Sequence, residues 1–162
     1  MVNGKLGCFG NPSLDIEMMT RALDLAEQAS QVGEVPVGAL VTIEGRIVSQ
    51  AYNLRETLAD PTAHAERLAL TLAGRALGSW HLESCTIYVT LEPCCMCAGA
   101  INLSRISRLV YAASDPKAGA CRSLFRMLDD RRLNHRISQT SGVLAEESRK
   151  LLSSFFQKQR SV

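Results

Sequence analysis

The chain has 162 residues, of which 46% are hydrophobic and 21% are charged, and its net charge is +2. This length allows one domain with a real hydrophobic core, and the composition excludes a disordered or fibrous chain. No apolar run approaches the roughly 18 residues that cross a bilayer, so no membrane-spanning segment is expected.

Residues 1–12 contain Gly, Asn and Pro and lack the apolar centre of a secretory signal, so they are predicted to form a flexible tail. Residues 13–162 are predicted to be a single domain. Six cysteines in a chain without such a signal indicate a reducing compartment, the cytoplasm. There thiols serve as metal ligands more readily than as disulfides.

The positive charge is concentrated in the last third of the chain. Residues 1–104 carry six Lys or Arg against eleven Asp or Glu, whereas residues 105–162 carry twelve against five. A basic segment suits a polyanionic partner such as a nucleic acid. The alternative is a solvated helix surface, where scattered charges usually lie.

The first half of the chain has the patterns of a helix, two strands and a second helix. Ser13 can cap the first helix, and Gly33 ends it after a run with apolar residues three and four apart. Glu44-Gly45 joins the two strands in a predicted hairpin. The four elements are predicted at residues 13–30, 37–43, 46–52 and 63–74.

The second half alternates strands and helices. Pro93 fits the first turn of a helix, where no N–H donor is needed. The predicted elements are a strand at 85–91, a helix from 93, a strand at 108–112, a short helix at 124–128, a loop and edge strand at 134–139, and a helix at 143–157. Such alternation after a hairpin predicts a three-layer α/β fold.

The strongest motif combines His64 with Cys94 and Cys97, thirty residues further on. Two thiols three residues apart at a helix start can point to one side, and the positive helix end favours thiolates. Cys95 should face elsewhere. One His and two Cys predict a catalytic zinc with a fourth position open for water. A structural zinc, or buried free thiols, is the alternative, but a closed site normally has four protein ligands.

Glu66 lies two residues after His64, a spacing that does not place both side chains on one helix face. We therefore interpret it as a proton carrier and not as a ligand, although Glu is usually a surface helix residue. The H-x-E and P-C-x-x-C segments together form the known signature of zinc-dependent nucleobase deaminases.

From about Asp15 to Phe156 the chain resembles the bacterial tRNA adenosine deaminases. The zinc motif alone indicates only the wider cytidine deaminase superfamily, and further segments narrow it. Cys95 and Cys121 depart from the family pattern. The resemblance rests on Glu34-Val35-Pro36-Val37-Gly38, Asn53, Asp60-Pro61-Thr62-Ala63-His64-Ala65-Glu66, Tyr88-Val89-Thr90-Leu91-Glu92-Pro93-Cys94, Met96-Cys97-Ala98-Gly99-Ala100, Ser104-Arg105-Ile106, Asp115, Lys117, Gly119, Asn134-His135-Arg136 and Phe155-Phe156.

The resemblance implies a five-stranded mixed sheet with helices on both faces and one zinc per subunit of a homodimer. It implies hydrolytic deamination of the wobble adenosine of a tRNA anticodon to inosine, with an arginine tRNA bearing an ACG anticodon as substrate. Glu66 would take a proton from the water that attacks C6 and deliver protons to N1 and to the departing amine.

The resemblance also implies substrate contacts. Asn53 would bind the edge of the flipped base, Val35 and Pro36 would shape its pocket, and the N–H of Ala65 would be a backbone partner. From the residues alone, Asn53 is equally a turn former, and Val35-Pro36 an apolar strand entry. The RNA groove would include Asp115, Lys117, Asn134, His135, Arg136, Phe155 and Phe156.

Two aromatic positions have a packing alternative. Because adjacent helix residues diverge, one of Phe155 and Phe156 should lie in the core and the other should be exposed. Trp80 is interpreted as a packing residue.

Two rival functions remain open at this point. A deaminase of a free base or nucleotide, such as guanine or a riboflavin precursor, would share the zinc site and lack the RNA surface. A non-catalytic RNA-binding zinc module would share the basic surface, but zinc binding alone does not need Glu66.

Overall fold

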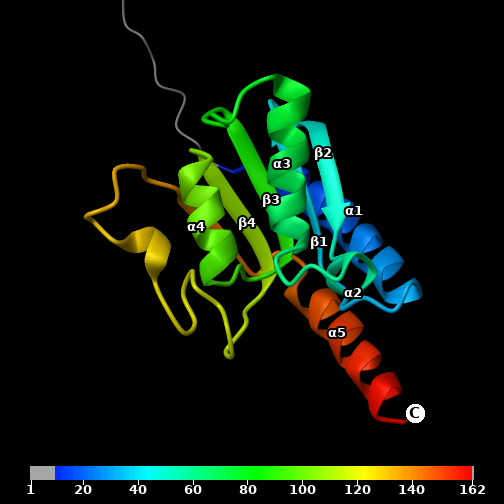
Figure 1. Cartoon of the computed structure of the whole chain (residues 1–162). Helices are drawn as coiled ribbons and strands as arrows, with labels where there is room; N and C mark the ends of the chain where they lie inside the picture. The colour runs from blue at the N-terminus through cyan, green and yellow to red at the C-terminus, as the bar shows by residue number, and fades with distance from the viewer. Residues whose placement is uncertain (1–9, 162) are drawn as a thin grey trace, which may run out of the picture.

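The computed structural model describes residues 10–161 of the chain (Figure 1). The prediction for residues 1–9 lies outside this part. The elements in chain order are α1 (Pro12–Gln31), β1 (Gly38–Ile43), β2 (Arg46–Tyr52), α2 (Arg55–Leu58), α3 (Ala65–Leu77), β3 (Cys85–Leu91), α4 (Cys95–Leu103), β4 (Arg108–Ala113), the 3-10 helix η1 (Met127–Asp129), β5 (Ser138–Ser141) and α5 (Ala145–Arg160).

The five strands form one mixed sheet in the order β2-β1-β3-β4-β5. β1 runs antiparallel to both β2 and β3, while β3, β4 and β5 are parallel to one another. Residues Glu44 and Gly45 have φ angles of 49° and 77°, as a two-residue hairpin turn requires. The predicted five-stranded α/β fold is confirmed.

Helices cover both faces of this sheet. α3 and α4 pack on the face that is turned toward the viewer in Figure 1, and α1 packs with α5 against the other face. Because side chains alternate along a strand, neighbouring residues enter opposite cores. Ile87 and Val89 of β3 lie in the core beneath α3 and α4, and Tyr88 lies in the core beneath α1.

Several element boundaries differ from the predictions. The side chain of Asn11, not Ser13, caps α1 by accepting from the N–H groups of Ser13 and Leu14. Pro93 is not in a first helical turn, because Cys94 is the extended N-cap of α4. The short helix predicted at 124–128 is a 3-10 turn at Met127–Asp129, and the four-residue helix α2 was not predicted.

No helix within residues 10–161 is both long enough and apolar enough to cross a membrane.

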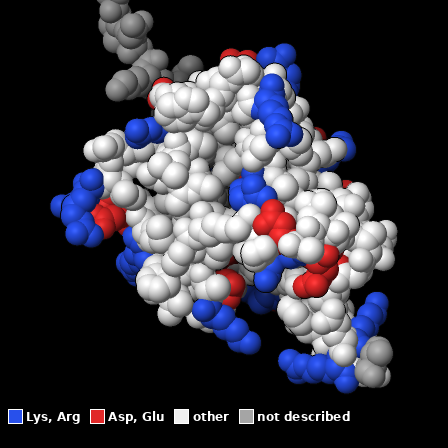
Figure 2. Space-filling view, viewed as in Figure 1, with Lys and Arg blue, Asp and Glu red and all other residues white. Residues whose placement is uncertain are grey.

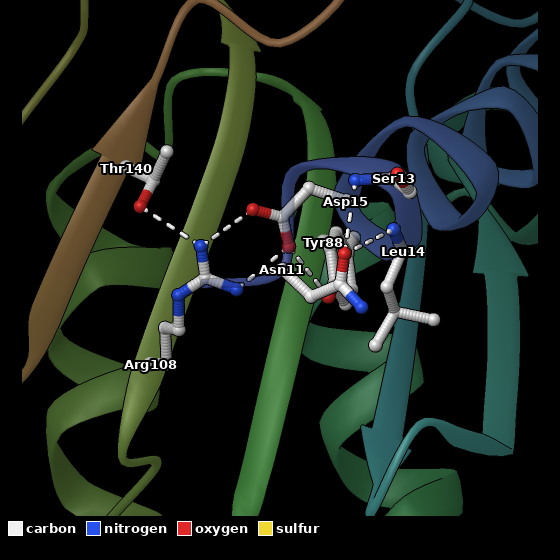
Figure 3. A network of polar contacts seen from close by, with 7 residues as sticks. All are labelled: Asn11, Ser13, Leu14, Asp15, Tyr88, Arg108 and Thr140. Carbon is white, nitrogen blue, oxygen red and sulfur yellow. Dashed lines mark hydrogen bonds and ion pairs between the residues drawn. The ribbon is translucent and has the colours of Figure 1, made fainter. Parts of the chain in front are cut away.

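A buried ion pair ties α1 to the sheet (Figure 3). Two guanidinium nitrogens of Arg108 donate to the two carboxylate oxygens of Asp15, each over 2.7 Å, and both residues are less than 10% exposed. The hydroxyl of Tyr88 donates to Asp15 over 3.0 Å, and Arg108 also donates to the Thr140 hydroxyl over 3.0 Å. One network therefore connects α1, β3, β4 and β5.

Burial opposes ionisation of Asp15, but the hydrogen bonds from Arg108 and Tyr88 outweigh it and lower the pKa of this carboxyl. A lowered pKa in the folded state stabilises the protein above the ordinary Asp value of 3.8. This contribution is lost as the pH falls through the folded-state pKa.

Replacing Arg108 by Met should lower the free energy of unfolding by about 3–5 kcal/mol, because it leaves Asp15 charged and buried without its partner. The matched change Arg46→Met removes an exposed partner of Glu44 and should have little effect. Urea denaturation at pH 7 measures both. Equal midpoints for the two variants would show that the buried pair is unimportant for stability.

Candidate metal centre and active site

Two helix N-termini bring three ligand side chains together. His64 is the N-cap of α3 and Cys94 is the N-cap of α4, both with extended backbone, and Cys97 lies in the first turn of α4. The Nδ1 atom of His64 is 3.7 Å from the sulfur of Cys94 and 3.6 Å from that of Cys97. The three ligand atoms all lie within 4.8 Å of one another.

These separations fit a tetrahedral zinc ion. Zinc bonds of about 2.0 Å to nitrogen and 2.3 Å to sulfur place two tetrahedral ligands about 3.6 Å apart. The cluster offers one nitrogen and two sulfurs, so one coordination position stays free of protein ligands. Cys95 is exposed and is not part of the cluster, as its position in the motif predicted. The chain therefore has the ligand set of a catalytic zinc site.

The protonation of the two thiols is coupled. The hydrogen bonds from the Cys97 thiol and from His64 together lower the pKa of Cys94 to about 3, although burial opposes this. The contact between Cys94 and Cys97, together with burial, raises the pKa of Cys97. A bound dication would favour the thiolate form of both cysteines, because its charge neutralises theirs.

Glu66 is buried in the first turn of α3 and lines the same cavity as His64 and Cys94. Burial raises its pKa above the ordinary Glu range. It is not part of the ligand cluster. Its place beside the cluster is that expected of a group that moves protons.

A cavity of about 210 Å³ opens beside the three ligands. This volume is below the range of pockets that hold drug-sized molecules and suits a single planar base. The predicted residues Val35, Asn53, Ala65 and Asp115 line it, whereas Pro36 is buried and does not. The complete lining is Val35, Val37, Asn53, Arg55, His64, Ala65, Glu66, Leu91, Glu92, Cys94, Asp115 and Ala118.

Asn53 is held in the cavity wall by Glu34, a buried carboxylate that we did not single out from the sequence. The Asn53 amide nitrogen donates to Glu34 over 3.3 Å and to the carbonyl of Val35 over 3.4 Å. Glu34 also accepts from the backbone N–H groups of Glu56 and Thr57 over 3.2 and 2.7 Å. The Asn53 amide oxygen is buried and has no partner within residues 10–161, so it can accept from a ligand.

Glu92 fixes the opposite wall in a similar way. Its carboxylate accepts from the backbone N–H groups of Asp115 and Arg122 over 3.0 and 2.7 Å, and from those of Cys121 and Ser123 over 3.1 and 2.9 Å. A Cβ atom at Gly119 would lie 2.5 Å from the Glu92 carboxyl carbon, so only glycine fits there. The loop that carries Asp115 is thus tied to the residue that precedes Pro93-Cys94.

The remaining predicted substrate residues lie outside the cavity. Lys117 is exposed on a turn beside Asp115, and Asn134 and Arg136 are exposed on the loop before β5. The Nε2 atom of His135 is hydrogen-bonded to the carbonyl oxygen of Ile106 over 2.5 Å, so this ring nitrogen is already paired within the protein.

The two aromatic residues of α5 divide between core and surface. Phe155 is 6% exposed and lies in the core, whereas Phe156 is 41% exposed. Phe155 is therefore the residue of the pair that packs in the core, and its burial does not fit the predicted contact with RNA. Trp80 is 64% exposed, so its interpretation as a packing residue is wrong.

Arg55, Glu34 and Glu92 are site residues that sequence reasoning missed. Arg55 follows Asn53 by two residues, and the other two lie inside the segments Glu34–Gly38 and Tyr88–Cys94 that carried the resemblance. Their proximity to motif residues was the available signal. The roles of Glu34 and Glu92 depend on backbone N–H groups more than twenty residues away, which no local pattern indicates.

The fold and the ligand set together define a zinc-binding deaminase domain. The profile of the cytidine and deoxycytidylate deaminase zinc-binding region matches residues 12–113. A relative from Haemophilus influenzae, a tRNA-specific adenosine deaminase, is 51% identical and covers 90% of this chain and 85% of its own length. The tRNA-specific adenosine deaminase of Bacillus subtilis is 49% identical, with 88% of each chain covered. The chain therefore belongs to the cytidine and deoxycytidylate deaminase zinc-binding family, and within it to the group of these relatives.

Solved structures share the architecture. One from a study of A-to-I editing by tRNA:A34 deaminases at the wobble position has a TM-score of 0.81 at 41% identity, with 84% of this chain and 99% of that chain covered. The guanine deaminase of Nitrosomonas europaea has a TM-score of 0.75, with 96% and 98% of the two chains covered. Its identity of 23% means that the likeness shows the fold alone.

Replacing Cys94 or Cys97 by Ser should greatly reduce zinc content, because each removes one of three protein ligands. Cys95→Ser is the matched control, since its thiol is exposed and lies outside the cluster. Metal content per purified chain, measured by atomic emission, distinguishes them. A loss of zinc in the Cys95 variant equal to that in the other two would refute the ligand assignment.

Proposed function

We propose that this protein hydrolytically deaminates the wobble adenosine of a tRNA anticodon to inosine, as a zinc-dependent hydrolase of cyclic amidine C–N bonds. The observation that carries the proposal is a base-sized cavity that combines the ligand cluster with buried Glu66 and Asn53. The tRNA-specific adenosine deaminases from two bacteria, at 49–51% identity over most of the chain, support the substrate. Residues 13–162 act as one catalytic domain in this proposal.

The ligand cluster fits zinc, which supplies a Lewis acid that lets water ionise near neutral pH. Glu66 accepts a proton from the water that attacks C6 of adenine and delivers it to N1. It then carries the second proton of that water to the amine, which departs as ammonia and leaves a carbonyl at C6. Asn53 and the N–H of Ala65 orient the base, so that C6 faces the attacking oxygen.

The RNA surface is proposed to follow the loop after β4 and the free end of α5. On the face shown in Figure 2, Lys and Arg side chains gather at these two places, with some acidic neighbours. Arg132 is paired with Asp130 over 2.6 Å, but Arg136, Lys158 and Arg160 form no ion pair within residues 10–161. Exposed Phe156 adds an aromatic surface on which an unpaired base can stack.

A homodimer is proposed to form over α3 and α4. In Figure 2 the surface over α4 is largely free of charged side chains, whereas Lys or Arg side chains lie over α3. The surface over both helices exposes Leu72, Leu77, Trp80 and Leu103, and it contains a groove of about 610 Å³ that Trp80 and Leu103 help to line. Contiguous exposed apolar side chains of this kind mark protein interfaces, and a second copy of this chain is the proposed occupant. A cytoplasmic location is proposed as well, because the proposed substrate is a tRNA.

Glu66→Ala should retain about one zinc per chain and remain folded, yet lose at least a ~10²-fold factor in turnover. The reason is that Glu66 moves protons and does not hold the metal. Single-turnover inosine formation and metal content, measured on the same preparation, check this. Near-normal turnover, or a zinc-free protein, would show that the role of Glu66 is misassigned.

Inosine should form in an anticodon stem-loop of an arginine tRNA with the ACG anticodon. Free adenosine should react far more slowly, because it lacks the remote contacts that orient the base. The KM for the stem-loop should rise with salt, since phosphate contacts release counterions. Rates on the stem-loop, adenosine and guanine at two salt concentrations decide between the functions. Fast turnover of guanine with an inert stem-loop would replace this proposal by a free-base deaminase.

A further inference from the structure

The guanidinium of Arg55 lies at the edge of the cavity and has no role in the proton transfers described above. Arg55 opens α2 and lines the cavity together with Asn53, two residues earlier. It is the only Lys or Arg among the twelve lining residues. Its side chain is exposed, so it lies at the rim and not at the floor.

The backbone around Arg55 is fixed while its guanidinium is free. Glu34 accepts the N–H groups of Glu56 and Thr57, and the carbonyl of Arg55 accepts from the N–H of Asp60 over 3.1 Å. Within residues 10–161 the guanidinium makes no hydrogen bond and no ion pair. A guanidinium without a hydrogen-bonded partner, carried on a fixed backbone, is available to bind an anion from outside.

None of the three carboxylates that line the cavity forms a hydrogen bond with this guanidinium. Glu92 is surrounded by backbone donors, and Asp115 accepts from the N–H groups of Lys117 and Ala118. Glu66 is buried at the metal cluster. The charge of Arg55 is therefore not balanced by a hydrogen-bonded carboxylate of the cavity lining.

The size of the cavity indicates which part of a substrate Arg55 meets. A cavity of about 210 Å³ holds a base, so the sugar and phosphates stay outside at the rim. Phosphate oxygens are the anions that a guanidinium fork binds best, often through two parallel hydrogen bonds. A free base or nucleoside carries no such group.

We propose that Arg55 binds a phosphodiester next to the nucleotide whose base enters the cavity, and so selects a base within a strand over a free nucleoside. This inference rests on the proposed function. Arg55 is a specificity-determining residue for RNA, and it leaves the proton transfers of Glu66 untouched.

Arg55→Ala should raise the KM for the anticodon stem-loop about 10- to 100-fold at unchanged kcat, the range for a hydrogen bond to a charged group. It should also lower the salt dependence of binding by about one counterion. Arg55→Lys should have a KM between those of the unmodified protein and Arg55→Ala, because lysine keeps the positive charge but lacks the two parallel N–H donors of the guanidinium. Arg46→Ala is the matched control: it removes an arginine from the β1-β2 hairpin, outside the cavity lining.

The decisive comparison uses stem-loops in which one phosphate flanking the wobble nucleotide is a neutral methylphosphonate. At one of the two positions the substitution should raise the KM of the unmodified protein, and it should add nothing in Arg55→Ala. If the effects of the two changes on the KM multiply instead, the inference is wrong. It is also wrong if the KM for Arg55→Ala equals that for Arg46→Ala. In both cases inosine formation still supports the proposed function. Absence of inosine with the unmodified protein and native stem-loop overturns both. Zinc content verifies that each variant is folded.

Discussion

The site depends on the meeting of two helix N-termini at the carboxyl end of β3. His64 and Cys94 are both N-cap residues, so their extended backbones turn their side chains toward one point. The positive ends of α3 and α4 face the same point, which favours negative charge on the ligands there. The parallel pairing of β3 with β4 and the packing of α3 across the sheet fix how closely these termini approach. The separations of 3.6 and 3.7 Å that suit zinc therefore follow from the architecture.

Two buried carboxylates keep the cavity walls in place around that point. Glu34 accepts hydrogen bonds from N–H groups at the start of α2, and Glu92 accepts them from N–H groups of the loop after β4. The first-turn N–H groups of α2 and those of the irregular loop after β4 would otherwise be unpaired donors next to a base-sized cavity. For both, burial opposes ionisation and the surrounding donors lower the pKa. These carboxylates do no chemistry, but they hold Asn53, Arg55 and Asp115 in fixed positions, which reduces the entropy lost when a substrate binds.

The opposite face of the sheet serves stability. The Asp15–Arg108 pair joins α1 to three strands, and none of its residues lines the cavity (Figure 3). The proposed functional surfaces lie on other segments: the loop after β4, the exposed end of α5 and the surface over α3 and α4. Phe155 links the two roles, because it anchors α5 in the core while its neighbour Phe156 is exposed. The proposed RNA contacts of α5 thus depend on a buried side chain that touches no RNA.

The sequence by itself determined most of the strands and long helices and the chemistry of the ligand set, because both depend on local patterns. Periodicity placed the strand at Cys85–Leu91 to the residue, and the C-x-x-C spacing identified Cys94 and Cys97 while excluding Cys95. It could not determine that His64 would be an N-cap, or that Glu34 and Glu92 would hold distant loops. It also left Phe155 and Phe156 unresolved and misjudged the burial of Trp80. Those outcomes depend on which elements pack together, and hydrogen bonds and burial between segments far apart in sequence exist only once the sheet has brought them into contact.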